Sequence, residues 1–390
     1  MKIEKSILKD ITTAPIMIAQ KNKTSINSCV RLEYKDGKLS VYASNGSQSV
    51  VFFAEAKEDG DEFDVLFAAD TLKRTVEAFD KVVEITFEND KELVFREKSF
   101  VRRANIAAYN VADFFFPEPK NLSEPFVLDD WQRRRLLQGA ENNLANPVRS
   151  PSAALVRLFS KDSGALELSA TDQHVAIMRK LPAEDGQVFP PLDVLIPPEA
   201  IRFFRGLDGD VKVMFDEREG AALPKPEGYM EGVDDPLPPA PKSHLLVLET
   251  SRARYFSTLG DGLVPPDCSR AFLPADRIFS ISVFDALELF KKFAQYDACT
   301  LFWGGELGTN IRISAATKTG ECSSQIDFDV GEVLGEGKYH INPAFVVSVF
   351  SGLQEAADAE FKVALRNDGN LMLQIHSGIS KAVIMGLKFD

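Results

Sequence analysis

Hydrophobic residues along the chain predict a strand followed by a helix at three places, 65–79, 194–207 and 339–353. In each segment a short apolar strand leads into a stretch where apolar residues return every three or four positions, the spacing of a buried helix face. Recurrence of one pattern at such large spacing indicates a repeated domain. The apolar helix positions are Leu72, Val76 and Phe79 in the first segment, Ile201, Phe204 and Leu207 in the second, and Phe345, Val349 and Leu353 in the third.

The segments around these helices repeat as well. After each helix, three stretches that alternate apolar and polar residues predict antiparallel strands with one solvated face. Each unit also opens with a short strand and a helix, starting near Ser6, Asp129 and Ser282, residue types that cap helices. We therefore predict an α+β fold of three domains, 1–122, 123–272 and 273–390. The strands are predicted at 1–4, 82–87, 93–95 and 101–106, at 126–128, 211–215, 245–248 and 253–257, and at 279–281, 361–365, 371–375 and 382–387.

A proline-rich segment interrupts the second domain. Residues 217–243 are rich in proline, glycine and acidic side chains, which predicts a loop inserted between two strands. The composition suits a solvated flexible loop, and it also suits a proline-rich docking site for a partner. The residues alone leave both possibilities open.

The charge of the chain argues against simple coating of nucleic acid. Its 45 lysines and arginines face 58 acidic residues, a net charge of −13, whereas a protein that coats DNA is basic. Basic residues nevertheless gather on the predicted helices. If the helices share one face, they would attract phosphates without sequence preference. Ordinary solvated helix faces are the alternative.

No export signal, membrane span or enzyme motif is recognisable. The longest apolar runs, such as 345–350, are too short to cross a bilayer, and the four cysteines are scattered, which predicts a cytoplasmic protein. The histidines are too dispersed to predict a metal cluster, and we expect no cofactor. One compact polar string, 170–174, places Asp172 and His174 two apart, which on a strand puts both on one face. A hydrolase that uses this pair is therefore one hypothesis.

Several short strings and their order resemble a known family. They are Ala170-Thr171-Asp172-Gln173-His174, Pro266-Asp267-Cys268-Ser269-Arg270, Ile341-Asn342-Pro343-Ala344-Phe345 and the tail Val383-Ile384-Met385-Gly386-Leu387-Lys388-Phe389. Together with the threefold repeat, they resemble the β sliding clamp, the β subunit of bacterial DNA polymerase III, over the whole chain. The resemblance implies sliding-clamp domains with the antiparallel sheet outside and two helices inside. It further implies a head-to-tail homodimer that closes a ring around duplex DNA, without catalytic chemistry. A monomeric repeat adaptor that never encircles DNA is the alternative.

The resemblance also implies a pocket between the second and third domains for short linear peptides of the polymerase and the clamp loader. Apolar walls there would bury a leucine or phenylalanine of the peptide. This chain departs from the family at Gln173, Val175 and Gly386, which stand where the family has glycine, arginine and proline, so we expect a reshaped pocket. The predicted pocket residues are Ala154, Thr171, His174, Val175, Pro266, Arg270, Ala271, Asn342, Phe345, Met372, Val383, Met385, Gly386 and Leu387.

Two further surfaces follow from the resemblance. The residues predicted to face DNA are Lys21, Lys23, Arg74, Arg133, Arg134, Arg149, Arg202 and Arg205. Because Arg133, Arg134 and Arg135 are consecutive on a helix, all three cannot face one side. The dimer contact is predicted to join the first domain of one copy to the third of another, through Phe100 and Ile106 on one side and Phe290 and Phe293 on the other.

Overall fold

The computed structural model describes residues 1–19, 25–161, 164–219, 242–317, 323–353, 358–365 and 371–387. The chain divides into two units. Unit 1 comprises residues 1–127 and 208–259, and unit 2 comprises residues 128–207 and 260–390. Most of the predicted inserted loop at 217–243, together with Lys21 and Lys23, lies outside the described residues.

Unit 1 contains two antiparallel sheets and two helices, α1 (Lys5–Ile18) and α2 (Ala69–Glu77). The four-stranded sheet has the order β1 (Lys2–Glu4), β6 (Val82–Glu88), β7 (Glu92–Glu97), β8 (Phe100–Asn105). The eight-stranded sheet has the order β5 (Phe63–Ala68), β2 (Cys29–Lys35), β3 (Lys38–Ser44), β4 (Gln48–Glu55), β16 (Ala253–Thr258), β15 (Lys242–Glu249), β14 (Val211–Glu219), β9 (Phe126–Leu128).

Unit 2 is built in the same way and carries four helices, α3 (Asp130–Leu137), α4 (Pro198–Gly206), α5 (Val283–Lys291) and α6 (Pro343–Ser351). Its eight-stranded sheet has the order β13 (Leu192–Ile196), β10 (Val156–Ser160), β11 (Ala165–Thr171), β12 (Val175–Pro182), β24 (Ser380–Met385), β23 (Leu371–Ser377), β22 (Asp358–Leu365), β17 (Asp276–Ser282). Its four-stranded sheet has the order β20 (Ser323–Asp329), β19 (Asn310–Ala316), β18 (Cys299–Trp303), β21 (Gly337–Ile341).

The strand orders confirm the threefold repeat. One half-sheet recurs as β1-β6-β7-β8, β9-β14-β15-β16 and β17-β22-β23-β24, and the other as β5-β2-β3-β4, β13-β10-β11-β12 and β21-β18-β19-β20. The eight-stranded sheets arise where half-sheets of consecutive repeats join, through β4 with β16 and β12 with β24. The exact domain boundaries at 122 and 272 stay a prediction.

Helix starts follow from the capping residues that the sequence supplies. Asp129 forms a capping box with Gln132, and the Ser282 hydroxyl accepts a hydrogen bond from the Asp285 N–H at 3.0 Å. Helix α1 differs, because it begins at Lys5 after Glu4, without a side-chain cap and one residue before the predicted Ser6. The predicted apolar positions of α2, α4 and α6, such as Leu72, Phe204 and Val349, are buried as expected.

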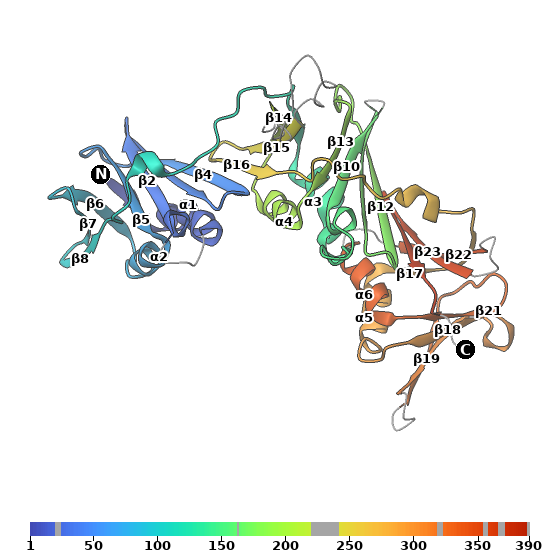
Figure 1. Cartoon of the computed structure of the whole chain (residues 1–390). Coiled ribbons are helices and arrows are strands. Elements are labelled where there is room, and N and C mark those ends of the chain that lie inside the picture. Colours follow the sequence, from blue (N-terminus) through green and yellow to red (C-terminus); the bar gives the residue numbers. More distant parts are fainter. Residues whose placement is uncertain are drawn as a thin grey trace, which may run out of the picture. The chain divides into compact units, whose positions relative to one another are not determined.

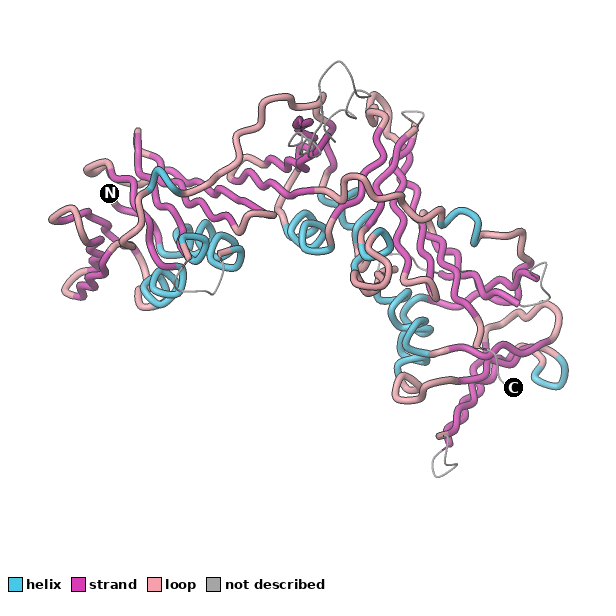
Figure 2. Tube along the Cα trace, viewed as in Figure 1, coloured by secondary structure: helices cyan, strands magenta, loops and turns pink. Residues whose placement is uncertain are grey.

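Within each unit the helices lie on one face of the sheets, and loops cross the other face (Figures 1 and 2). We call the face turned away from the helices the outer face. Residues 106–125 cross the outer face of the eight-stranded sheet in unit 1, and residues 260–275 do so in unit 2. Among the described residues, none of the helices has the length and apolar character needed to span a bilayer.

Candidate functional site

The loop between β11 and β12 is folded by its own polar side chains. Thr171 Oγ1 donates to the Val175 carbonyl at 2.7 Å, and Asp172 Oδ1 accepts from the backbone N–H groups of His174 and Val175 at 2.8 and 2.6 Å. These bonds form an Asx-type turn that fixes the loop tip. The Asp172 carboxylate therefore binds backbone N–H groups of its own loop. Among the described contacts it makes no hydrogen bond to the His174 imidazole, so the hydrolase hypothesis gains no support.

Gln173 stands where the resemblance leads us to expect glycine, and its backbone conformation shows why glycine would fit there. Its φ is +78°, in the left-handed region that glycine adopts readily and other residues adopt at a cost. The glutamine side chain offsets part of this cost, because Nε2 donates to Ser150 Oγ at 2.6 Å. The loop thus keeps the backbone shape that glycine permits, and it gains a tie to the segment before β10.

The tail after β24 is held on both sides. The Met385 N–H donates to the His174 carbonyl at 2.8 Å, and the Leu387 N–H donates to the His340 carbonyl at 3.0 Å. Between them, a Cβ at Gly386 would lie 3.0 Å from the Tyr339 hydroxyl oxygen, so a larger residue would press on this ring. Glycine at position 386 therefore leaves room for the Tyr339 ring.

The Tyr339 side chain holds β24 and the tail through hydrogen bonds of its hydroxyl group. Its hydroxyl donates to the Ile384 carbonyl at 2.8 Å and accepts from the Leu373 N–H at 3.1 Å. Burial raises the pKa of Tyr339 to about 12, so the phenol stays protonated and keeps the donor bond at physiological pH. The side chain thereby ties β21 to β23 and β24.

Phe345 and His174 meet at the rim of this region. Their rings are stacked at 5.8 Å between centroids with an interplanar angle of 13°. Phe345 is positioned by the start of α6, where Asn342 Oδ1 accepts from the Ala344 N–H at 2.9 Å and Pro343 begins the helix. The stack brings together a loop of the second repeat and a helix of the third, as the predicted pocket requires.

The loop at 266–275 covers the neighbouring strands. Val383, Met372 and Ala364 form a buried cluster against which Ala271 and Met385 pack, with Phe272, Leu273 and Ala275. Gln374 Nε2 donates to the Leu273 carbonyl at 2.8 Å and holds the loop to the sheet. Arg270 points into solvent, since its side chain is 86% exposed, and its Nε donates to Asp267 Oδ2 at 2.9 Å.

The structure therefore gathers most of the predicted pocket residues into one region of unit 2. Thr171, His174, Phe345, Met385 and Val383 are joined through the contacts above. Among the others, Ala154 and Val175 are buried beside the loop, and Pro266 is half-buried. Their role in binding a peptide stays a prediction.

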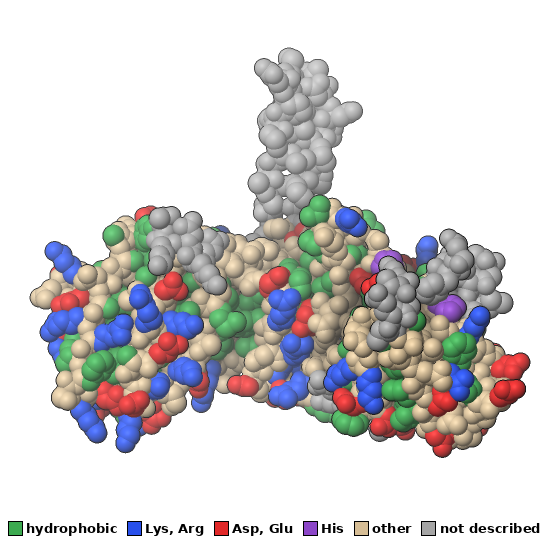
Figure 3. Space-filling model, turned by 90° about the horizontal axis from the view of Figure 1, so that it is seen from below, with side chains coloured by type: hydrophobic (Ala, Val, Ile, Leu, Met, Phe, Trp, Pro, Cys, Tyr) green, Lys and Arg blue, Asp and Glu red, His purple; other side chains and the backbone are tan. Residues whose placement is uncertain are grey.

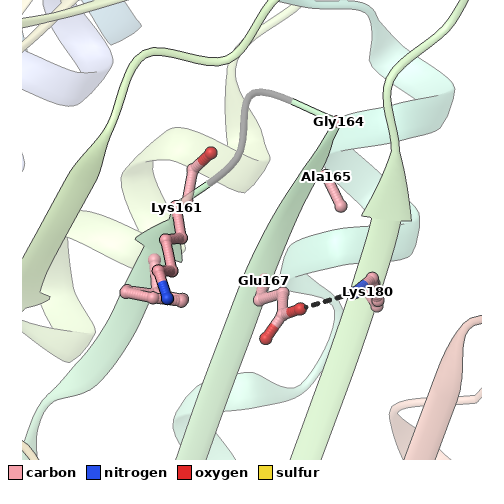
Figure 4. Close-up of a pocket in the computed structure, with 7 residues that line it drawn as sticks. Lys161, Gly164, Ala165, Glu167 and Lys180 are labelled. Carbon is pink, nitrogen blue, oxygen red and sulfur yellow. Dashed lines mark ion pairs between the residues drawn. The ribbon is translucent and has the colours of Figure 1, made fainter.

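Two cavities that the sequence did not predict lie on the outer face next to this region. One, of about 190 Å³, is lined by Arg157, Phe159, Glu167, Leu168, Ser169, Met178 and residues 267–269. The other, of about 390 Å³, shares Phe159 and Glu167 with it and contains the ion pair between Lys180 Nζ and Glu167 Oε1 at 2.9 Å (Figure 4). The only sequence signal was the period of two that puts Arg157 and Phe159 on one face of β10, and Glu167 and Ser169 on one face of β11.

The predicted DNA-facing residues separate into exposed and buried groups. Arg74 on α2, Arg149 and Arg202 are exposed, and Arg134 is exposed while it pairs with Asp130 at 2.8 Å. Arg205 is half-buried and pairs with Glu141 at 2.9 Å. The view in Figure 3 shows lysine and arginine side chains with acidic side chains between them.

The prediction for Arg133 is wrong. Its side chain is 0% exposed, and the guanidinium donates to Asp130 Oδ1 and to the Leu207 carbonyl at the end of α4. A carboxylate and a helix-end carbonyl satisfy the buried charge, so Arg133 joins α3 to α4 and does not face solvent.

The predicted dimer residues also separate. Phe100 on β8 is 48% exposed and Ile106 is half-buried, so both are accessible. Phe290 and Phe293 are 1% and 0% exposed, and Phe290 stacks on Phe361 of β22. These two rings belong to the core of the third repeat, and their assignment to an interface is corrected.

Comparisons with known proteins identify the fold. Residues 1–116 match the family model described as DNA polymerase III beta subunit, N-terminal domain. The sliding clamp of Pseudomonas aeruginosa bound to griselimycin superposes with a TM-score of 0.81 at 17% identity, and the beta subunit of Thermotoga maritima with 0.78 at 16%. The C. crescentus beta sliding clamp gives 0.77 at 17%.

Each of these superpositions covers 100% of this chain and 99% of the other. The chain therefore has the β sliding clamp fold along its whole length, which confirms the predicted fold. No curated protein matches it in sequence. Among the described residues, no group of three histidine, cysteine or acidic side chains is placed to hold a metal ion.

Proposed function

We propose that this protein is a DNA sliding clamp, a non-catalytic, cytoplasmic processivity factor that encircles duplex DNA as a head-to-tail homodimer. The sliding-clamp fold over the full chain and the family match of residues 1–116 support this function. Enclosure also reconciles DNA binding with a net charge of −13, because a closed ring stays on DNA without tight phosphate contacts.

The observation that carries the proposal is a pair of open sheet edges. In the repeat, β8 corresponds to β16 and β24, while β20 corresponds to β4 and β12. Both corresponding pairs are joined within the chain, as β16 with β4 and β24 with β12. Among the described residues β8 and β20 lack this partner, and an unpaired edge is a template for another chain. Pairing β8 of one copy with β20 of the next would repeat the same joint head to tail.

The ring proposal is tested by a substitution on this edge. Val101 on β8 is 45% exposed, and Val101→Asp places a charge at the proposed joint. We expect the native protein to have twice the 43.2 kDa mass by light scattering and, once loaded, to stay on nicked circular DNA until the circle is linearised. The variant should be a monomer that is not retained.

Val82→Asp is the matched control, because Val82 is 36% exposed on β6 of the same sheet but not on its open edge. It should leave mass and retention unchanged. A monomeric native protein, or retention that survives linearisation, would contradict the ring and favour the monomeric adaptor.

The same proposal assigns the region around His174 and Phe345 to partner peptides. Met385, which is half-buried between the Val383 cluster and the His174 carbonyl, supplies an adaptable apolar wall. Replicative polymerase and clamp loader are the proposed partners, bound through short linear segments. Residues of this region come from two repeats, so the site exists only while β12 and β24 stay paired.

Met385→Asp should abolish binding of a fluorescein-labelled peptide taken from the polymerase, measured by anisotropy, because it puts a charge into an apolar wall. Dimer mass should not change. Lys381→Ala, on the same strand but exposed, is the control and should bind normally. Full affinity in the Met385 variant would show that peptides bind elsewhere.

A further inference from the structure

An exposed aromatic ring stands among arginines on the helical face of unit 2. Trp131 on α3 is 50% exposed, although a large indole is usually mostly covered. Trp131, Arg134 and Arg135 are three and four positions apart, so they share one side of the helix. The Arg135 guanidinium carbon lies 4.4 Å from the centroid of the indole ring, a cation–π contact.

The Arg135 guanidinium lies close to two parts of unit 2. Besides the indole, it approaches the turn between β23 and β24, where a Cβ on Gly378 would lie 3.0 Å from Nη2. Helix α4, which packs beside α3, carries the exposed Arg202. The indole thus has Arg135 against its face and is half exposed, while Arg134 on the same helix pairs with Asp130.

We propose that Trp131 and Arg135 form a stacking platform for an unpaired base of single-stranded DNA. This inference rests on the proposed function, because it assumes that the helical face meets DNA. Bases of an intact duplex are stacked on each other and offer their faces to no side chain, whereas unpaired bases stack on aromatic rings whatever their sequence. The arginines would attract the phosphates of the same strand.

Tryptophan fluorescence reads this contact directly. The chain has two tryptophans, and Trp303 is only 6% exposed, so a bound base can reach and quench Trp131 but not Trp303. A short oligothymidylate should quench the emission of the full-length protein, and a duplex of the same length should quench it much less. Trp131→Ala should weaken binding of a labelled oligothymidylate roughly tenfold, since base–aromatic stacking contributes that order of affinity, and should leave duplex binding unchanged.

Phe284→Ala is the matched control, because Phe284 also exposes its ring, by 72%, on a helix of unit 2. It should bind oligothymidylate like the native protein. Arg135→Gln should lose part of the quenching, because the ring is no longer held. Unquenched native emission, equal quenching by the duplex, or normal oligothymidylate binding by Trp131→Ala would overturn the platform.

Retention on nicked circular DNA keeps this inference separate from the clamp proposal. Trp131→Ala should be retained like the native protein, because enclosure does not need the indole. If the native protein is retained but not quenched by oligothymidylate, the platform is wrong and the clamp stands. If it is quenched but never retained, the clamp proposal is wrong.

Discussion

The outer faces of the two eight-stranded sheets are built alike but covered differently. In unit 1 the crossing segment inserts Phe116 edge-on between Tyr42 and Phe256, at 5.1 and 5.4 Å between ring centroids. In unit 2 the crossing segment leaves a cavity of about 190 Å³, lined by Cys268 together with side chains of β10, β11 and β12. Unit 1 fills this position with an aromatic ring of its own chain, whereas unit 2 keeps a cavity on its outer face.

The strand pairings show which residue of unit 1 corresponds to which residue of unit 2. Ser49 pairs with Ser44 and Phe256 in unit 1, just as Ala176 pairs with Thr171 and Val383 in unit 2. Counting back two residues along β3 and β11 sets Tyr42 against Ser169. A shared detail supports the match, because Arg31 pairs with Asp64 and the corresponding Arg157 with Asp193, each at 2.7 Å. An aromatic ring in one unit thus corresponds to a small hydroxyl in the other.

The strand pairs that join the repeats, β4 with β16 and β12 with β24, differ at a second pair of corresponding residues. Counting forward three residues sets Phe52 of β4 against Arg179 of β12. Arg179 is 3% exposed, and it donates to the carbonyls of Leu136 and Gly352 at the ends of α3 and α6, at 2.9 and 3.0 Å. Burial lowers the pKa of Arg179 to about 10, so it remains charged at neutral pH. Unit 2 therefore fastens its two repeats with hydrogen bonds to helix ends.

Arg179→Met is the substitution from which we expect the largest loss of stability in unit 2. Two buried carbonyls would lose their donor, which costs about 3 kcal/mol of the free energy of unfolding. Both tryptophans belong to unit 2, so the midpoint of urea unfolding followed by tryptophan fluorescence should fall. Peptide binding should weaken too, because α6 positions Phe345.

Lys180→Met is the control for this variant. Lys180 is the next residue on β12, but it is exposed and its ion pair with Glu167 is a surface pair, which contributes little. Its unfolding midpoint should match that of the native protein. If Arg179→Met also unfolds at the native midpoint, the joint does not depend on the guanidinium.

The fold could be predicted from the sequence because its signals are local. Apolar spacing in α2, α4 and α6, alternation in the strands, and caps such as Asp129 and Ser282 each fix one element without knowledge of the rest. Repetition then supplied the architecture. Two of the predicted pocket strings lie on correctly predicted elements, since 343–345 begin helix α6 and 383–385 end strand β24. The other two, 170–174 and 266–270, lie in segments for which no element was predicted.

Side-chain direction in tertiary contacts could not be predicted. Three consecutive arginines at 133–135 do not reveal that Arg133 turns inward, because its partner is the Leu207 carbonyl of another helix. The apolar face of α5 gives the same pattern whether it meets its own sheet or a second copy, and Phe290 meets Phe361 of its own repeat. The cavity beside Cys268 forms between residues 267–269 and strands that lie about a hundred residues earlier in the chain, so no local pattern predicts it.

Phe116→Ala removes the ring that covers the outer face of unit 1, and we expect it to lower stability less than Arg179→Met. The ring is half-buried against Met214, Val247 and Phe256, so its loss costs about 2 kcal/mol, less than for a fully buried phenylalanine. Because unit 1 contains no tryptophan, urea unfolding should shift by far-UV circular dichroism while the fluorescence midpoint stays put. Phe115→Ala, at a neighbouring ring that is 61% exposed, should change neither signal. Equal shifts for the two variants would mean that Phe116 does not seal unit 1, and the contrast with unit 2 would then rest on Arg179 alone.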